Sequence, residues 1–263
     1  MKNYFKLMSL FLGMALCTTA FVACGSDDDD NTSNGGTSGG SVSNVIGTWE
    51  DSFSTYTFTD KELTITTNEQ LTFNGAYKIE NGQLKYTQTV EGREVVNTAT
   101  IKLLYGMTVM VLKTVPDNPD DYSLSEVAQV LFKKGTTPNI PVSDIQGTWH
   151  WYMRGDTDYV RTGLTINGNK FDMIITPWGQ RYTGTFTYSK GVMKLNTEHG
   201  YTSREAGTGY GSGEGSLDAK TLEGQWNTLD IEHWTIWEEM PFIADGSEAY
   251  GWVAGLPAVF VKK

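Results

Sequence analysis

From about residue 44 onward, the chain alternates apolar and polar side chains with a period of two. The apolar positions of the first stretch are Tyr56 and Phe58, Leu63 and Ile65, Leu71 and Phe73, Tyr77 and Ile79, and Leu84 and Tyr86. Those of the second stretch are Leu164 and Ile166, Phe171 and Met173, Phe186 and Tyr188, and Met193 and Leu195. This spacing places apolar side chains on one face of a strand, and the short polar breaks predict hairpins. We therefore expect antiparallel meanders, arranged either as closed barrels without exposed edges or as a sandwich.

Four blocks of sequence occur twice in the same order. They are "NVIGTWE" at 44–50 with "DIQGTWH" at 144–150, "YTFTDKELTI" at 56–65 with "LTINGNKFDM" at 164–173, "NGAYKIENGQLKY" at 74–86 with "TGTFTYSKGVMKL" at 183–195, and "VLFKK" at 130–134 with "AVFVK" at 258–262. The offset between copies grows from 100 to 128, and each increase falls in a segment that resembles a loop. A duplicated domain with loop insertions has this pattern. We predict one domain at 44–135, a linker at 136–143 and a second domain at 144–263.

Each predicted domain opens with Gly-Thr-Trp, at 47–49 and 147–149, followed by short strands. This arrangement resembles lipocalins, and in particular the small lipocalin-like domains of Bacteroidota lipoproteins. The resemblance implies two tandem eight-stranded antiparallel barrels, each closed at one end by its tryptophan. The arginine that this family packs over the tryptophan has no clear counterpart in the sequence, since the last strands carry Lys133, Lys134, Lys262 and Lys263.

The N-terminal segment has the plan of a secretory signal. Lys2 and Lys6 precede an apolar run from about residue 7 to residue 23, which ends at Cys24. The end of this run resembles the bacterial lipobox, which implies that residues 1–23 are a signal peptide and that Cys24 becomes acylated. The chain would then be attached to membrane lipid through Cys24. The alternative is an uncleaved membrane anchor, although a span needs about 20 apolar residues.

A polar segment at 24–43 follows, rich in Gly, Ser, Asn and Asp, and it is expected to be a flexible tether. Its aspartates can be interpreted as a metal site, as part of a solvated linker or as an address. "CGSDDDD" resembles the acidic signal that directs Bacteroidota lipoproteins to the outer face of the outer membrane. On this resemblance, Ser26, Asp27, Asp28, Asp29 and Asp30 form an export signal, and the protein is exposed on the cell surface.

The acidic composition of the chain limits the classes of partner that it is expected to bind. Without Lys2 and Lys6, 18 basic residues face 31 acidic ones, a net charge of about -13. Such a charge disfavours nucleic acid. If Cys24 is acylated and Cys17 leaves with the signal, no disulfide can form, and stability must come from an ordinary core.

No catalytic or metal motif is present in the sequence. His150, His199 and His233 are far apart, and none has a metal-ligand spacing. No nucleophile is paired with a base, so we expect neither an enzyme nor a cofactor nor a metal site. The acidic residues at 117–121 fit solvated turns better than a calcium loop.

The tryptophans are concentrated in the second domain. We interpret Trp49, Trp149, Trp151 and Trp226 as core residues. The candidate ligand-binding residues are Trp178 at a hairpin tip and Trp234, Trp237, Tyr250 and Trp252 in a predicted insertion at 230–256. Residues 230–241 have apolar positions at three-residue steps, which predicts a short helix ending at Pro241 that serves either as a lid or as a plug.

Three functions follow as hypotheses. The first is binding of a small apolar or amphipathic molecule in the second barrel, as the lipocalin resemblance implies. The second is binding of a surface glycan by exposed Trp and Tyr side chains of the second domain. The third is a structural or partner-binding lipoprotein whose barrels are filled by their own side chains.

Overall fold

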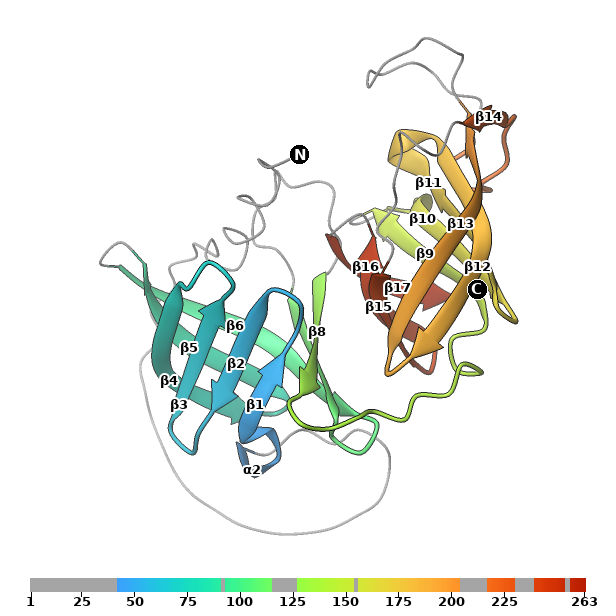
Figure 1. The fold of residues 1–263 in the computed structure, drawn as a ribbon. Helices are drawn as coiled ribbons and strands as arrows, with labels where there is room; N and C mark the ends of the chain where they lie inside the picture. The colour runs from blue at the N-terminus through green and yellow to red at the C-terminus, as the bar shows by residue number, and fades with distance from the viewer. Residues whose placement is uncertain are drawn as a thin grey trace.

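The structure is a computed structural model, and it describes residues 42–90, 93–114, 127–153, 156–203, 217–229, 239–253 and 256–263. Two antiparallel barrels lie side by side, and the segment 134–146 joins them (Figure 1). The predicted pair of tandem antiparallel barrels is therefore confirmed. The residues that carry the predicted signal peptide, Cys24, Ser26 and Asp27 to Asp30 lie outside the described residues.

The first barrel is an up-and-down meander of eight strands, preceded by the short helix α2 (Val42–Val45). The strands are β1 (Gly47–Glu50), β2 (Ser54–Phe58), β3 (Glu62–Thr67), β4 (Thr72–Glu80), β5 (Gln83–Val90), β6 (Arg93–Leu104), β7 (Val109–Thr114) and β8 (Val127–Lys133). Strand β8 pairs with β1 and closes the barrel.

The second barrel has the same order of neighbours. Its elements are β9 (Gly147–Met153), β10 (Asp156–Asn167), β11 (Lys170–Ile175), the 3₁₀ turn η1 (Thr176–Trp178), β12 (Gln180–Ser189), β13 (Val192–Thr202), β14 (Asn227–Leu229), β15 (Glu239–Asp245), β16 (Glu248–Val253) and β17 (Leu256–Lys262). Strand β13 pairs with β15, and β17 pairs with β9, so eight strands close the ring while β14 extends the far end of β13.

The repeated blocks occupy equivalent strands in the two barrels. Blocks 56–65 and 164–173 form the hairpins β2–β3 and β10–β11, and blocks 74–86 and 183–195 form β4–β5 and β12–β13. The last block is shifted by one residue from the sequence alignment: Lys133 pairs with Trp49 and Lys262 with Trp149, an offset of 129 rather than 128. The inward side chains fix this register, because a slip of one residue would turn them outward.

The predicted insertion at 230–256 is largely part of the barrel wall. Strands β15 and β16 lie inside it, and Met240 and Pro241 belong to β15. The prediction that a helix ends at Pro241 is therefore wrong. Met240, Phe242 and Ala244 all face the core of the second barrel, which is the period-two pattern of a strand. The remaining part of the predicted helix, 230–238, lies outside the described residues.

Both Gly-Thr-Trp tryptophans belong to the cores of their barrels. Both side chains are fully buried, and each indole nitrogen donates to a carbonyl four residues earlier, Trp49 to Val45 at 2.7 Å and Trp149 to Ile145 at 2.8 Å. Each ring is also covered by a cation. Lys133 Nζ lies 5.4 Å from the Trp49 ring centroid, and Lys262 Nζ lies 5.0 Å from that of Trp149.

In both barrels the cation over the indole face is thus a lysine ammonium from the last strand, a contact that an ammonium can make with an aromatic ring.

Four aromatic side chains form a continuous chain of ring contacts inside the second barrel, from Trp149 to Trp151. Trp149 contacts Phe242 with ring centroids 5.8 Å apart, Phe242 contacts Phe260 at 5.3 Å, and Phe260 contacts Trp151 at 6.5 Å. All four side chains are almost completely buried. The part of the barrel around these four residues is thus a packed core, as in small barrels that are filled by their own side chains.

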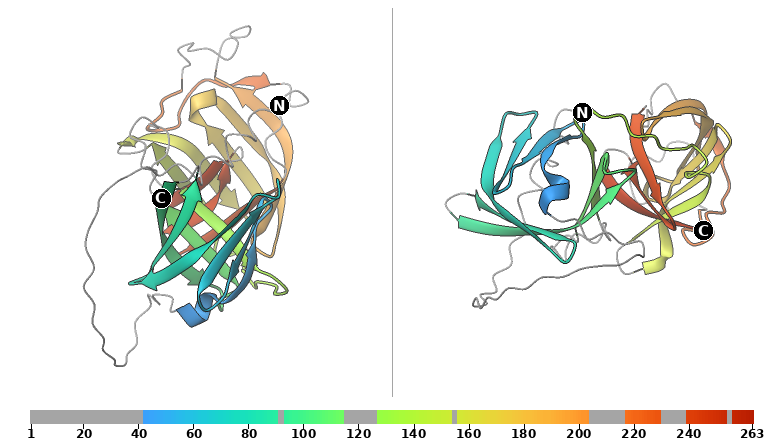
Figure 2. Two further views of the ribbon diagram at one scale, coloured as in Figure 1. Left: turned by 90° about the vertical axis from the view of Figure 1, so that its left-hand side faces the viewer. Right: turned by 90° about the horizontal axis from the view of Figure 1, so that it is seen from below.

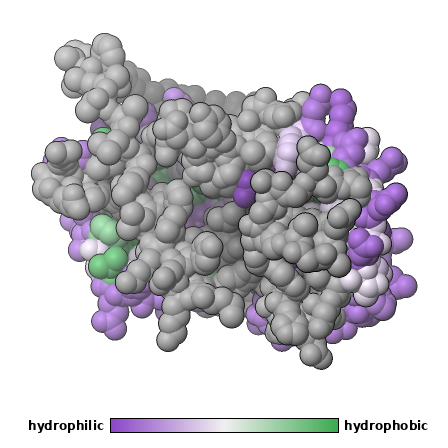
Figure 3. All heavy atoms as spheres, turned by 90° about the horizontal axis from the view of Figure 1, so that it is seen from above, coloured by the Kyte–Doolittle hydropathy of each residue, from purple (hydrophilic) through white to green (hydrophobic). Residues whose placement is uncertain are grey.

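The two barrels share a third apolar core between them. Outward side chains of β7 and β8 pack against outward side chains of β15, β16 and β17. In the ribbon views, the green strands of the first barrel lie beside the red strands of the second (Figure 2). The buried members of this core are Val109, Val111, Ala128, Val130, Ile140, Ile243, Tyr250 and Val259. Strand β7 is therefore buried on both faces, which explains its continuous apolar run "VMVL" at 109–112. In the view from above, the described residues at the surface are mainly hydrophilic (Figure 3).

Candidate functional site: the η1 end of the second barrel

The structure separates the sequence-predicted ligand residues from one another. Trp178 is 38% exposed on η1, whereas Tyr250 is fully buried and Trp252 is 8% exposed. Trp234 and Trp237 lie outside the described residues. The expectation that Tyr250 and Trp252 are exposed for stacking on a glycan is therefore wrong, because the first barrel covers both.

Tyr250 belongs to a charged network that crosses between the barrels. Its hydroxyl donates to Glu248 Oε2 at 2.6 Å and accepts from Lys102 Nζ at 2.7 Å. Lys102 also bonds Asp245 at 3.1 Å, and Lys113 Nζ lies 3.1 Å from Glu248 Oε1. Partial burial alone would raise the pKa of Glu248, but hydrogen bonds from the tyrosine and both lysines outweigh it and lower the pKa to about 2. These contacts join the barrels and leave Tyr250 little freedom to bind a ligand.

Trp252 also packs between the barrels. Phe53, in the β1–β2 loop of the first barrel, stacks on it with ring centroids 4.7 Å apart and planes 13° from parallel. Such a stacked pair contributes roughly 0.5–1.5 kcal/mol beyond the area it buries. The loop of the first barrel thus covers the ring that the sequence assigned to ligand.

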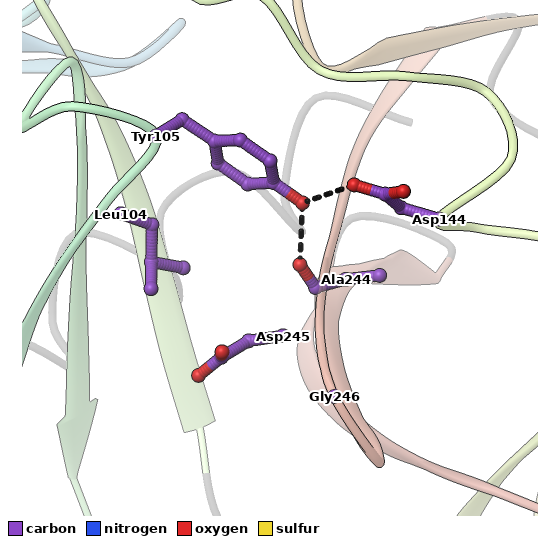
Figure 4. Close-up of a pocket in the computed structure, with 6 residues that line it drawn as sticks. All are labelled: Leu104, Tyr105, Asp144, Ala244, Asp245 and Gly246. Atoms are coloured by element: carbon purple, nitrogen blue, oxygen red, sulfur yellow. Dashed lines mark hydrogen bonds between the residues drawn. The ribbon is translucent and has the colours of Figure 1, made fainter. Parts of the chain in front are cut away.

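A cleft of about 420 Å³ opens beside this interface, lined by Leu104, Tyr105, Asp144, Ala244, Asp245 and Gly246 (Figure 4). The Tyr105 hydroxyl points from the first barrel toward the second and donates to Ala244 O at 2.6 Å, with Asp144 Oδ2 at 3.3 Å. Burial and the nearby Asp144 carboxylate raise the pKa of Tyr105 to about 12. The cleft therefore has a structural tie running through it, and its polar groups are engaged in holding the barrels together.

A different set of buried residues lies at the η1 end of the second barrel, meaning the end at which β11 and β12 are joined by η1. The backbone pairings Trp151–Thr162, Thr162–Ile175 and Ile175–Gln180 place four residues in one row on neighbouring strands. Directly paired residues share a face of the sheet, and Trp151 and Ile175 belong to the barrel core, so the whole row faces inward. All four side chains are at most 6% exposed.

Two polar atoms in this row have no hydrogen-bond partner among the described residues. They are the indole nitrogen of Trp151 and the hydroxyl of Thr162, whose residues are 1% and 0% exposed. The neighbouring Gln180 is engaged, because its Oε1 accepts from the Tyr182 hydroxyl at 2.8 Å. A buried polar atom without a partner costs about 1–3 kcal/mol, so native proteins rarely leave two side by side.

The equivalent row of the first barrel pairs most of its polar side chains with one another. Asp51 stands at the position of Trp151, Ser54 at that of Thr162, and Gln129 at that of Ala258. Ser54 Oγ donates to Asp51 Oδ1 at 3.0 Å, and Gln129 Nε2 donates to Asp51 Oδ2 at 2.7 Å. Gln129 Oε1 accepts from the Tyr56 hydroxyl at 2.8 Å.

One hydroxyl in the first barrel's row, Thr67 Oγ1, is buried and has no partner in the described chain, but Thr67 itself is partly exposed. The two copies thus differ at the same place. The first barrel closes this end with a carboxylate and an amide, and the second replaces them with an indole and a methyl group. As a result, Trp151 Nε1 and Thr162 Oγ1 keep hydrogen-bonding capacity that no described residue uses.

Sequence reasoning classed Trp151 as core and did not single out Thr162 or Gln180. Trp151 is indeed buried, but burial does not account for its unpaired nitrogen. The available signal was the divergence between the copies, "GTWED" at 47–51 against "GTWHW" at 147–151, where a carboxylate is replaced by tryptophan. Trp226, also interpreted as core, is only half-buried, and its ring centroid lies 5.8 Å from the guanidinium carbon of Arg181.

Within the described ranges, no three His, Cys, Asp or Glu side chains gather closely enough to hold a metal ion. No helix in those ranges is long and apolar enough to cross a membrane. No family model matches this chain, and comparisons with curated proteins and with solved structures found no match.

Proposed function

We propose that this chain is a non-enzymatic lipoprotein of the cell envelope that binds a small apolar or amphipathic molecule at the η1 end of its second barrel. The observation that carries the proposal is the pair of buried, unpartnered atoms Trp151 Nε1 and Thr162 Oγ1. A ligand that forms hydrogen bonds with both atoms removes the free-energy penalty of burying them unpaired. This gain would contribute to the affinity of the ligand.

The location rests on the sequence. The lipobox-like end of the apolar run at Cys24 and the aspartates at 27–30 support an acylated protein exported to the outer surface of the outer membrane. Acyl chains would hold it there, because each buried methylene contributes about 0.8 kcal/mol.

The other two hypotheses have weaker support. Of the predicted glycan-stacking residues that the structure describes, Trp178 alone is exposed, and a single aromatic side chain offers a small platform. The filled-barrel hypothesis accounts for the aromatic core around Trp149. It gives no role to the unpaired atoms Trp151 Nε1 and Thr162 Oγ1.

Mass spectrometry under non-denaturing conditions tests the proposal. The full-length chain, purified from its host without added lipid, should carry a bound small molecule that is lost when the protein is denatured. A spectrum with only the mass of the lipidated polypeptide, together with unchanged tryptophan fluorescence on titration with apolar ligands, would contradict the proposal.

A further inference from the structure

The first barrel indicates what kind of group the η1 end of the second barrel lacks. Asp51 accepts from Gln129 with one carboxylate oxygen and from Ser54 with the other. At this end of the first barrel, a carboxylate of the chain itself therefore accepts the hydrogen bonds of Gln129 and Ser54. At the equivalent place the second barrel has Trp151 and Ala258, neither of which has a side-chain acceptor.

The two unpartnered atoms restrict the complementary group. An indole nitrogen can only donate, and a threonine hydroxyl can donate or accept, so both can bond to one oxygen acceptor. An ammonium group has donors only and would leave the Trp151 N–H unpaired. It would also bring a second positive charge toward Arg161, whose guanidinium carbon lies 4.8 Å from the Trp151 ring centroid.

The surroundings of the pair are mainly apolar. Ile175 follows Thr162 in the row, Phe260 contacts Trp151, and Ala258 is fully buried on the adjoining strand. Gln180, the other polar member of the row, already accepts from Tyr182. A ligand therefore meets the two unpartnered atoms among mainly apolar side chains, with the Arg161 guanidinium over the Trp151 ring. The hydroxyl of Thr176 in η1 is a further buried atom without a partner among the described residues.

We infer that the molecule bound at the η1 end is an apolar compound with an oxygen acceptor, either a carboxylate or a hydroxyl, held by Trp151 Nε1 and Thr162 Oγ1, and that cationic amines are selected against. This inference rests on the proposed function and specifies the ligand class for the same site.

Three ligands with one apolar body test this inference: decanoate, decan-1-ol and decylammonium, each titrated into the full-length chain by isothermal calorimetry below its micelle concentration. Decanoate or decan-1-ol should bind at least tenfold more tightly than decylammonium. Trp151→Phe, which keeps a ring but removes the N–H, and Thr162→Val, which is nearly isosteric, should each weaken the oxygen ligands roughly fivefold to tenfold. The matched control is Ser54→Ala at the equivalent position of the first barrel, which should leave these affinities unchanged.

The outcomes separate the inference from the function on which it rests. If none of the three ligands binds, the proposed function fails and the inference fails with it. If decylammonium binds as tightly as decanoate, the inferred ligand class is wrong while the proposed function stands. If decanoate binds but neither Trp151→Phe nor Thr162→Val weakens it, the ligand is not held by these two atoms, and both the inference and the proposed site at the η1 end are wrong.

Discussion

Replacing Thr162 with valine should stabilise the ligand-free protein. The Thr162 side chain is fully buried, and its hydroxyl has no partner among the described residues. Valine has nearly the same shape and the same preference for strands, so the change removes an unsatisfied polar atom with little repacking. An unpartnered buried hydroxyl costs about 1–3 kcal/mol, and we expect the free energy of unfolding to rise by about 1 kcal/mol.

The equivalent change in the first barrel should have the opposite sign. Ser54 Oγ donates to Asp51 Oδ1 at 3.0 Å and accepts from Gln129 Nε2 at 3.0 Å. Ser54→Ala removes both bonds and leaves part of the buried network unpaired, so the free energy of unfolding should fall by about 1–2 kcal/mol.

Urea unfolding and calorimetry on the two variants measure this difference. If the barrels unfold together, 1 kcal/mol corresponds to a shift in Tm of about 2–4 °C for a unit of this size. The unfolding slope should be unchanged, because neither variant alters the area exposed on unfolding. A loss of 1 kcal/mol or more in Thr162→Val would show that the hydroxyl has a partner in the free protein, and it would refute the reasoning behind the site.

Three further predictions concern the start of strand β9, the interface between the two barrels and the export of the protein. Gly147→Ala should cost about 1–3 kcal/mol, because Gly147 has φ 117° and a new Cβ would lie 3.1 Å from Lys262 Cε; thermal unfolding measures it. Since the pKa of Glu248 is lowered to about 2, its contribution to stability is complete above pH 4.5 and is lost as the pH falls from 4.5 toward 2. After allowance for solvent screening the loss should be about 1 kcal/mol, measured by urea unfolding across this pH range. Alanine at Asp27 to Asp30 should make the protein inaccessible to protease added to intact cells.

Each of these has a discriminating outcome. Glu248→Gln should flatten the stability profile between pH 4.5 and 2, and an unchanged slope would assign the acid sensitivity to other carboxylates. Wild-type stability of Gly147→Ala would mean that the strand entry tolerates a side chain. Unaltered protease cleavage after the aspartate substitutions would count against the export signal.

The period-two pattern was sufficient to predict strands β2 to β5 and β10 to β13, because each barrel buries one face of its sheet. It failed where burial is two-sided. Strand β7 is apolar on both faces, and the interface that covers Tyr250 is formed by parts of the chain more than 100 residues apart. No local pattern reports such a contact.

The candidate site shows the same limit. The sequence identifies Trp151 as a large apolar residue, and it is buried. Whether its nitrogen is paired depends on the side chains that lie opposite, Thr162 and those of β17, and so on the register of three strands. The duplication supplied a comparison that a single domain could not, because Asp51 shows how the same position is satisfied in the first barrel.

The most direct test of the central claim is the indole N–H signal of Trp151 in ¹⁵N-resolved NMR spectra during titration with decanoate. Hydrogen bonding to the ligand should move this signal downfield in proportion to occupancy. The signals of Trp49 and Trp149, whose nitrogens already donate to Val45 and Ile145, should stay in place. A Trp151 signal that remains fixed while decanoate binds would contradict a binding site at the η1 end of the second barrel.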